Sequence, residues 1–271
     1  MRVAGRRFAV EIAPDRVLVW VRGEGLVVDE PALGRWSEDT SRLLGTGDAA
    51  PRGPEGTELV APFGIFELGH PEAAAQLLRQ LSSRAVGRIS FARHELVLAV
   101  SARLSTSARR VLLQAALDGG ARMAHVLDLP LALAFGAGLP VTSWDPSPVV
   151  YLLPQGAQAG IVCHHGLLAD GAVELPLGAG VPGEEEAEAV LGLLARVLAE
   201  APPRHLPRVK DQGLHLAGRG VELERWRDLL VRRTGLRARV VPDPAHCAVK
   251  GAEVALERVE GSGSRALLYL R

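Results

Sequence analysis

The apolar positions of the chain fall into short runs, separated by glycine, proline and charged residues, that alternate with stretches of helical period. Short apolar runs bounded by turn residues predict strands, and apolar positions that recur every three or four residues predict helices. The segment 37–58, rich in glycine, proline and acidic residues, predicts a loop or a small, poorly ordered excursion. The rest of the first half predicts strands at 8–12, 17–21 and 26–29, a helix at 71–85, a strand at 96–100, a helix capped by Ser105 and ended by Gly119, a strand at 124–127 and a short helix after Pro130.

The same order of elements returns in the second half. Such a repeat is typical of a duplicated mixed α/β unit, in which each half joins a strand meander to helix-linked strands. Two lobes of this kind face each other across a cleft, and ligands bind at the strand ends that face it. The predicted elements are strands at 149–153, 159–163 and 166–175, a helix at 184–200, a strand at 214–217, a helix at 221–234, a strand at 239–241 and a last helix at 244–257.

Composition argues against several classes of protein. The 31 basic residues balance the 31 acidic ones, so no overall field attracts nucleic acid or lipid. No apolar run approaches the roughly 18 to 20 residues of a transmembrane helix, and the start of the chain lacks the long apolar core of a signal peptide. Cys163 and Cys247 form no CxxC pair, and we interpret them as buried thiols in a reducing compartment. A cytoplasmic location is expected.

Four segments, in the right order across most of the chain, resemble the MreB family of bacterial actin-like proteins. The run FAVEIAPDRVLVWVRGEGLVVDEP at 8–31 is similar to the family's opening meander and its GxGxVxxEP ending. The stretch 111–141 resembles the one that connects the family's lobes, and its most telling part, DLPLALAFGAGLPV at 128–141, is close to the family's EEPMAAAIGAGLPV. The run VLAEAPPRHLPRVKDQGLHLAGRGVELERW at 197–226 resembles the family's paired prolines, strand and glycine-rich turn. The run TGLRARVVPDPAHCAVKGAEVALE at 234–257 resembles its last block.

The resemblance implies a duplicated actin-like (ribonuclease H-like) α/β fold, with lobe I at 1–142 and lobe II at 143–271. One small subdomain is missing, because after Gly180 the chain passes almost directly into the helix at Glu184. In the family this subdomain contributes to filament contacts. The resemblance also implies a site for ATP and Mg²⁺, built from two phosphate hairpins and a glycine-rich adenosine turn. Glycines let backbone amides approach phosphate without a Cβ, and Mg²⁺ requires hard oxygen ligands.

Both phosphate hairpins depart from the family's pattern. In the first, Glu11 keeps a carboxylate, whereas Pro14 removes an amide donor and Asp15 brings negative charge toward the phosphates. In the second, the family's Asp-x-Gly-Gly-Gly-Thr is replaced by YLLPQG at 151–156, so that Tyr151 stands in place of the acid. Two like charges 4 Å apart repel by about 1 kcal/mol in water and by several more at a partly buried site. The hairpins are therefore poorly suited to Mg-ATP.

The adenosine turn, AGRGV at 217–221, keeps more of the family's pattern. Asp128 matches an acid near the water-activating position, although the neighbouring acid has become Leu129. We expect weak ATP binding at most, Mg²⁺ only together with ATP, and hydrolysis that is absent or vestigial. Arg16 and Arg219 are candidates for direct phosphate contact. The cofactor-binding residues that the resemblance implies are Glu11, Arg16, Asp128, Gly218, Arg219, Gly220 and Val221.

Four of these residues also have a purely structural interpretation. Gly218 and Gly220 equally suit a tight strand-to-helix turn. Glu11 suits a hydrogen-bond acceptor between the lobes, and Asp128 suits a helix cap. No metal site is predicted, because too few acids or cysteines accompany the histidines in the sequence; these histidines are His164, His165 and His246.

The resemblance implies a cytoskeletal or scaffold protein that acts in cell-shape determination and cell-wall synthesis and is not an enzyme. Its expected partners are a full-length MreB-type actin homologue and wall-synthesis membrane proteins. Ile89 and Phe91 lie between arginines and match an apolar loop that contacts the membrane in MreB relatives; packing onto the protein is an equal alternative. The other function classes are an active ATPase of the actin, chaperone or sugar-kinase superfamily, which Pro14, Pro154 and Tyr151 disfavour, and an orphan interaction scaffold.

Overall fold

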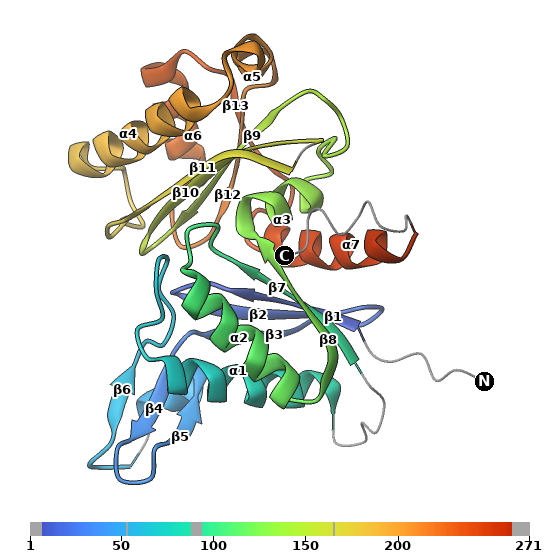
Figure 1. Cartoon of the computed structure of the whole chain (residues 1–271). Helices are drawn as coiled ribbons and strands as arrows, with labels where there is room; N and C mark the ends of the chain where they lie inside the picture. The colour runs from blue at the N-terminus through green and yellow to red at the C-terminus, as the bar shows by residue number, and fades with distance from the viewer. Residues whose placement is uncertain (1–6, 53, 88–93, 165, 262–271) are drawn as a thin grey trace. The chain divides into compact units, whose positions relative to one another are not determined.

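The computed structural model describes residues 7–52, 54–87, 94–164 and 166–261 and divides them into two compact units (Figure 1). Within these limits, unit 1 holds the residues up to Val100 together with Leu104–Val126, and unit 2 holds Ser101–Arg103 and the residues from Leu127 onward. The sequence-based boundary at residue 142 differs from this division. Residues 127–142 group with unit 2, because helix α3 (Leu129–Gly136) packs there against helix α7 (Cys247–Gly261).

Unit 1 is a mixed sheet covered by helices. Its main sheet has the strand order β3-β2-β1-β7-β8, with β1 antiparallel to β2 and parallel to β7. A second, three-stranded sheet has the order β5-β4-β6. The elements are β1 (Arg7–Ile12), β2 (Arg16–Val21), β3 (Gly25–Pro31), β4 (Gly34–Ser37), β5 (Arg42–Thr46), the 3-10 helix η1 (Gly47–Arg52), β6 (Glu58–Val60), α1 (Pro71–Val86), β7 (His94–Val100), α2 (Thr106–Asp118) and β8 (Ala121–Asp128).

Unit 2 repeats the main sheet of unit 1 strand for strand. Its order is β11-β10-β9-β12-β13, with β9 antiparallel to β10 and parallel to β12. The predicted duplication is thus confirmed by two sheets of the same topology. Besides α3 and α7, the elements are β9 (Ser147–Leu153), β10 (Gly156–Cys163), β11 (Gly166–Glu174), α4 (Glu184–Glu200), the 3-10 helix η2 (Pro203–His205), α5 (Leu206–Gln212), β12 (Leu214–Gly218), α6 (Leu223–Thr234) and β13 (Ala238–Val240).

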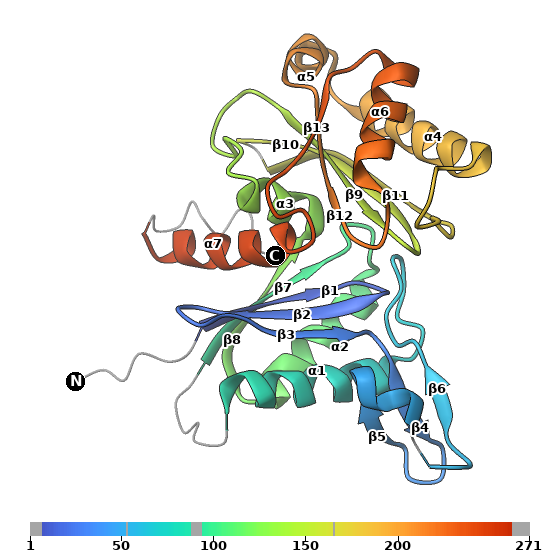
Figure 2. The same cartoon turned by 180° about the vertical axis from the view of Figure 1, so that it is seen from behind.

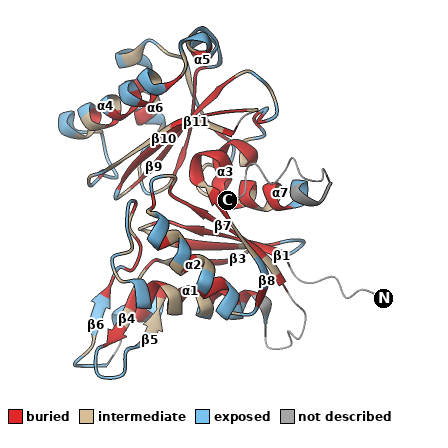
Figure 3. Ribbon diagram, in the orientation of Figure 1, coloured by how far each residue is buried: buried red, intermediate tan, exposed pale blue. Residues whose placement is uncertain are grey.

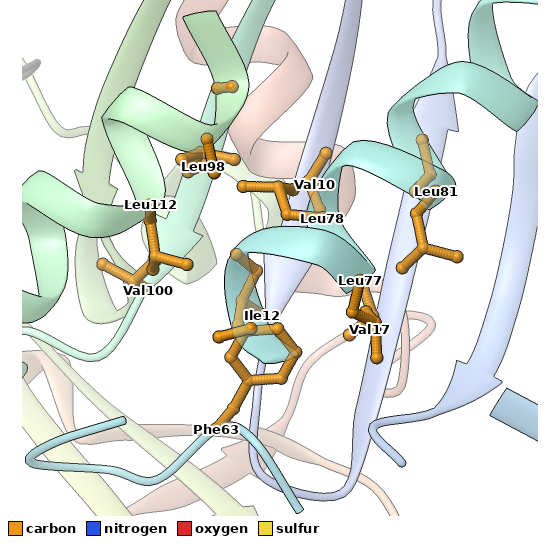
Figure 4. Packing of buried hydrophobic residues seen from close by; sticks show 14 of the residues in the cluster. Val10, Ile12, Val17, Phe63, Leu77, Leu78, Leu81, Leu98, Val100 and Leu112 are labelled. Atoms are coloured by element: carbon orange, nitrogen blue, oxygen red, sulfur yellow. The ribbon is translucent and has the colours of Figure 1, made fainter. Parts of the chain in front are cut away.

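Helices α1 and α2 bury one face of the unit 1 sheet. Ser105 caps α2 as predicted, since its hydroxyl accepts a hydrogen bond from the Ala108 amide at 3.2 Å. Alternate strand residues face the helices, because side chains alternate across a strand. Each fully buried aliphatic side chain stabilises the fold by roughly 1.5–3 kcal/mol. The packed residues include Val10, Ile12, Val17, Leu77, Leu78, Leu81, Leu98, Val100 and Leu112 (Figure 4).

The prediction of a loop or a small, poorly ordered excursion at 37–58 is wrong. Strands β4, β5 and β6 form a small sheet in this region, pinned to α1 by the Gln76 side chain, which accepts from the Leu43 amide and donates to the Ser41 carbonyl, both at 2.9 Å. Trp36, Leu43 and Val60 give this sheet its buried face. Its strands are three to five residues long, too short for an alternating pattern to stand out among the glycines, prolines and acids. Helix α5 was likewise not predicted.

In unit 2, helices cover both faces of the sheet (Figure 2). Ala159 and Ile161 of β10 join the cluster that includes Val190 and Leu193 of α4. Gly160 between them faces α3, because a Cβ there would lie 2.7 Å from the Pro130 Cβ. With both faces covered, β9 and β10 are buried along their whole length (Figure 3).

Residues 175–183 form the connection from β11 to α4, which the resemblance identifies as the place of the missing subdomain. They carry neither helix nor strand, so the last strand of the meander leads straight into α4. No helix in the part of the chain that the structure describes is long and apolar enough to cross a membrane.

His215 makes the stability of unit 2 depend on pH. Burial lowers the pKa of this histidine, and the neighbouring Arg239 lowers it further, against the opposing effect of the hydrogen bond to the Pro148 carbonyl. The ring is 1% exposed; its Nδ1–H donates to the Pro148 carbonyl at 3.0 Å, and its Nε2 accepts from the Arg239 guanidinium. The neutral form therefore suits the folded state.

Because the pKa of His215 is lower when folded than when unfolded, its contribution is fully present above the unfolded pKa, about 6.5, and is lost below it. We expect urea denaturation at pH 5.5 to show a lower free energy of unfolding than at pH 7.5. The His215→Gln variant should lose less over the same interval. This comparison separates His215 from His94 and His125, whose pKa values burial also lowers. An equal loss in both proteins would contradict the assignment.

Candidate functional site

The first hairpin, in unit 1, is a tight two-residue turn. The Ala13 amide donates to the Arg16 carbonyl at 3.1 Å, which leaves Pro14 and Asp15 as the tip between β1 and β2. Proline has no N–H, so one of the two tip residues offers no backbone donor. Glu11, near the end of β1, is fully buried. This hairpin therefore combines a buried carboxylate with a tip that is short of amide donors.

Arg16 is engaged within its own sheet. Its Nε donates to the Asp29 carboxylate, and its Nη2 donates to the Asp29 carbonyl at 2.8 Å. The two residues lie diagonally across β2 and β3, and both are about one-third exposed. The Asp29 carboxylate therefore already pairs with the charge of Arg16, the candidate for phosphate contact.

The second hairpin, in unit 2, has the same two-residue form. Leu153 pairs with Gly156, so the tip consists of Pro154 and Gln155. Tyr151 precedes the tip on β9 and is 1% exposed. As in the first hairpin, a proline takes the place of an amide donor, and the strand that leads into the tip carries no acid.

The turn from β12 into α6 lies directly on this hairpin. The Arg219 amide donates to the Leu152 carbonyl at 3.2 Å. A Cβ at Gly218, whose φ is +143°, would lie 1.9 Å from the Leu152 oxygen, and a Cβ at Gly220 would lie 2.6 Å from the Pro154 Cγ. Only glycine fits at either position. Close packing against the hairpin is therefore sufficient to explain both glycines.

The Arg219 side chain reaches across to Tyr151. Its Nη1 donates to the tyrosine hydroxyl at 2.6 Å, and its Cζ lies 5.8 Å from the centre of the tyrosine ring. The same nitrogen lies 3.4 Å from the Ala245 carbonyl. The resemblance places a carboxylate at position 151. This chain instead has the neutral phenol of Tyr151 there, hydrogen-bonded to the Arg219 guanidinium. Val221, which follows Gly220 in the turn, is half-buried against the unit 2 core.

Asp128 lies at the N-cap of α3 and makes no side-chain cap hydrogen bond. Its negative charge acts on Asp170 of β11, which sequence reasoning missed. Burial raises the pKa of Asp170; the charges of Asp128 and Glu200 raise it further, and Arg103 opposes them. The Arg103 Nη1 lies 3.6 Å from the Asp170 Oδ2. A single acid inside the otherwise apolar run GLLADGAV was the available signal.

Two of the histidines and both cysteines singled out in the sequence contact neighbouring groups of the protein. The His246 Nδ1 lies 2.9 Å from the Asp243 carboxylate, and the His164 ring lies 4.3 Å from that of Trp144. Both cysteines are buried, as predicted, and the Cys247 thiol lies 3.5 Å from the Leu133 carbonyl. Among the residues described, no three histidine, cysteine, aspartate or glutamate side chains gather as a metal ion would require.

Solved structures share this architecture. MreB5 of Spiroplasma citri bound to ADP aligns with a TM-score of 0.78 and 16% identity, covering 96% of this chain and 97% of that one. A double helical filament of MamK aligns with a TM-score of 0.72 and 14% identity, covering 93% and 99%. The chain thus has an actin-like fold, as predicted.

The sequence places the chain within that class. The family model described as MreB/Mbl protein matches residues 5–175, and the chain therefore belongs to the MreB/Mbl family. The cell shape-determining protein MreB of Escherichia coli strain K12 is 21% identical, with 94% of each chain covered. The corresponding protein of Pasteurella multocida is 20% identical, again with 94% of each covered. The Escherichia coli alignment runs over 334 residues, more than the 271 of this chain, so parts of that relative have no counterpart here.

Proposed function

We propose that this MreB-family chain is a cytoplasmic cytoskeletal or scaffold protein that takes part in cell-shape determination and cell-wall synthesis without hydrolysing ATP. The observation that carries the proposal is the contact between Arg219 and Tyr151 at 2.6 Å. It joins the adenosine turn to the second hairpin through side chains, where the resemblance implies a carboxylate that handles Mg²⁺.

The donor set of unit 2 fits Mg-ATP poorly. Mg²⁺ prefers carboxylate, water and phosphate oxygens in octahedral geometry, and position 151 supplies a phenol already bonded to a cation. Phosphates are cradled by successive backbone amides, and Pro154 interrupts them. In unit 1, Pro14 and Asp15 form the hairpin tip, and Arg16 is paired with Asp29. We propose that nucleotide binding is weak and that Mg²⁺ is bound only together with nucleotide.

The proposed partner is a full-length MreB-type actin homologue, acting with wall-synthesis membrane proteins. Support comes from the relatives: the Escherichia coli protein is called cell shape-determining, and MamK forms a double helical filament. The chain keeps both of the five-stranded sheets that the duplicated fold repeats. With only residues 175–183 where the small subdomain belongs, it lacks one of the family's filament contacts. We therefore propose that it joins or modulates filaments built by the full-length protein.

Co-sedimentation tests this proposal. The purified chain is mixed with full-length MreB from the same cells under conditions in which MreB pellets with ATP. We expect the chain to pellet with MreB and to stay in the supernatant alone. If it remains in the supernatant in both cases, and affinity capture from cells recovers neither MreB nor its membrane partners, an orphan interaction scaffold is the better assignment.

A membrane contact through Ile89 and Phe91 belongs to the same proposal, although both residues lie outside the described part of the chain. Each apolar side chain buried in a bilayer contributes roughly 1.5–3 kcal/mol, enough for weak attachment that avidity strengthens. We expect replacing both residues with aspartate to reduce co-sedimentation with liposomes. The matched control replaces Leu117, a 46% exposed side chain on α2, with aspartate. Unchanged co-sedimentation of the double variant would contradict the contact.

A further inference from the structure

A pocket on unit 2 combines an exposed aromatic ring with positive charge. It has a volume of about 510 Å³ and is lined by Trp144, Arg204, His205 and Arg208. Trp144 lies in the loop between α3 and β9, whereas the other three residues belong to η2 and α5. The pocket shares no lining residue with the second hairpin or with the turn that follows β12. Trp144 is 58% exposed, which is unusual for so large an apolar side chain.

The loop that carries Trp144 is fixed on both sides of the tryptophan. The Ser143 carbonyl accepts a hydrogen bond from the His164 amide at 2.7 Å, and the Ser143 hydroxyl accepts one from the Asp145 amide at 3.1 Å. The indole itself rests on the His164 ring, with 4.3 Å between the ring centres. Its exposed face is therefore presented in a defined position.

The two arginines are oriented by neighbouring side chains. His205 is only 6% exposed, and its Nε2 accepts from the Arg204 Nε at 3.2 Å. The Arg208 Nη1 donates to the Asp145 carboxylate at 3.0 Å. A guanidinium carries five N–H donors, so both arginines retain donors for a ligand. With Asp145 counted, the pocket keeps an excess of positive charge.

We propose that this pocket binds a phosphate ester, with the phosphate between Arg204 and Arg208 and the organic group against Trp144. Guanidinium groups match the oxygens of a phosphate in paired hydrogen bonds. An exposed indole stacks on a ring or sits among lipid headgroups. A soluble phosphorylated ring compound and a phospholipid headgroup share this chemistry. The inference does not depend on the nucleotide hairpins or on the proposed function.

Phenyl phosphate, the smallest probe with both features, provides the test. Added to the full chain, it should change the Trp144 fluorescence saturably, and the change should vanish in Trp144→Phe. Arg204→Gln and Arg208→Gln should each weaken binding about tenfold, the effect of one lost charged hydrogen bond. Arg225→Gln, which alters an exposed arginine on α6, is the matched control and should bind as the unmodified chain does.

Asp145→Asn gives a prediction of opposite sign. It removes the carboxylate that competes with phosphate for Arg208, so binding should become tighter. Vesicles of phosphatidylglycerol, compared with phosphatidylcholine, form the second arm. Arginine-dependent binding of phenyl phosphate supports a soluble ligand, and arginine-dependent binding of phosphatidylglycerol vesicles alone supports a lipid headgroup. If neither probe binds saturably, or if both arginine variants bind as the unmodified chain does, the proposal is overturned.

Discussion

Replacing Gly251 with alanine is expected to destabilise unit 2 by at least about 3 kcal/mol, beyond the usual cost of one added methyl group. Gly251 lies on α7, where that helix packs on α3. A Cβ there would lie 1.8 Å from the Ala132 carbonyl oxygen and 2.4 Å from the Gly136 nitrogen. Both obstacles are backbone atoms, so no side chain can rotate to make room. The two helices would have to move apart.

The rest of the α3–α7 contact makes that movement costly. Gly136 of α3 meets the partner helix just as closely, since a Cβ there would lie 1.8 Å from the Cys247 oxygen. Ala248, Ala252 and Ala255 of α7 are buried. Small residues on both helices bring the two backbones close together. Moving the helices apart at Gly251 would therefore weaken the dispersion interactions along the whole α3–α7 interface.

Gly192→Ala is the matched control for this prediction. Gly192 is exposed in the middle of α4, and a Cβ there would meet no atom within 4 Å. Alanine should therefore stabilise the protein by about 0.5–1 kcal/mol, through helix propensity alone. Urea denaturation followed by circular dichroism measures both variants. If Gly251→Ala proves as harmless as Gly192→Ala, the close helix contact does not exist in solution.

The sequence predicted the elements whose signals are local. Ser105 caps α2, and Gly235, with φ +69°, ends α6 as expected of a glycine after a helix. The helix at 184–200 has the predicted bounds. The last helix begins at Cys247 rather than Pro244, because Asp243 and the residues after it form a turn. The Asp243 carboxylate stabilises this turn through hydrogen bonds with the side chains of His246 and Lys250. Local patterns could not give the domain boundary, which depends on where α3 packs.

The candidate site was predictable only in part. Motif matching identified Tyr151 and Arg219 separately, one as a lost acid and the other as a candidate for phosphate contact. Their contact could not be foreseen, because it joins residues 68 positions apart through the parallel pairing of β9 with β12. The two glycines were left with two interpretations, and the distances to Leu152 and Pro154 supply a packing reason for both. Asp170 lies in none of the four matched segments, and its place inside the apolar run GLLADGAV was the one signal that the sequence offered.

Purified chain supplied with ATP and Mg²⁺ is expected to release phosphate no faster than the buffer does, whereas full-length MreB measured in parallel turns over. Each factor of ten in rate corresponds to about 1.4 kcal/mol of transition-state stabilisation. Phosphoryl transfer depends almost entirely on positioning and on charge neutralisation by metal, amides and cations. Pro14 and Pro154 remove amides, and Tyr151 removes a carboxylate. If each of these lost groups lowers the rate by a factor of ten or more, the three losses together leave no measurable ATP hydrolysis.

A continuous phosphate-release assay measures the rate of ATP hydrolysis. The Glu11→Gln variant is the control that separates hydrolysis by this chain from hydrolysis by a contaminating enzyme. Glu11 is the buried carboxylate of the first hairpin, where the resemblance places an acid, whereas the second hairpin has Tyr151 at the corresponding position. Release that requires Mg²⁺, approaches the rate of MreB and disappears in Glu11→Gln would show that the chain is an ATPase after all. Release that persists in Glu11→Gln would instead come from a contaminating enzyme. The difference in phosphate release between the unmodified chain and Glu11→Gln therefore tests the proposed absence of hydrolysis.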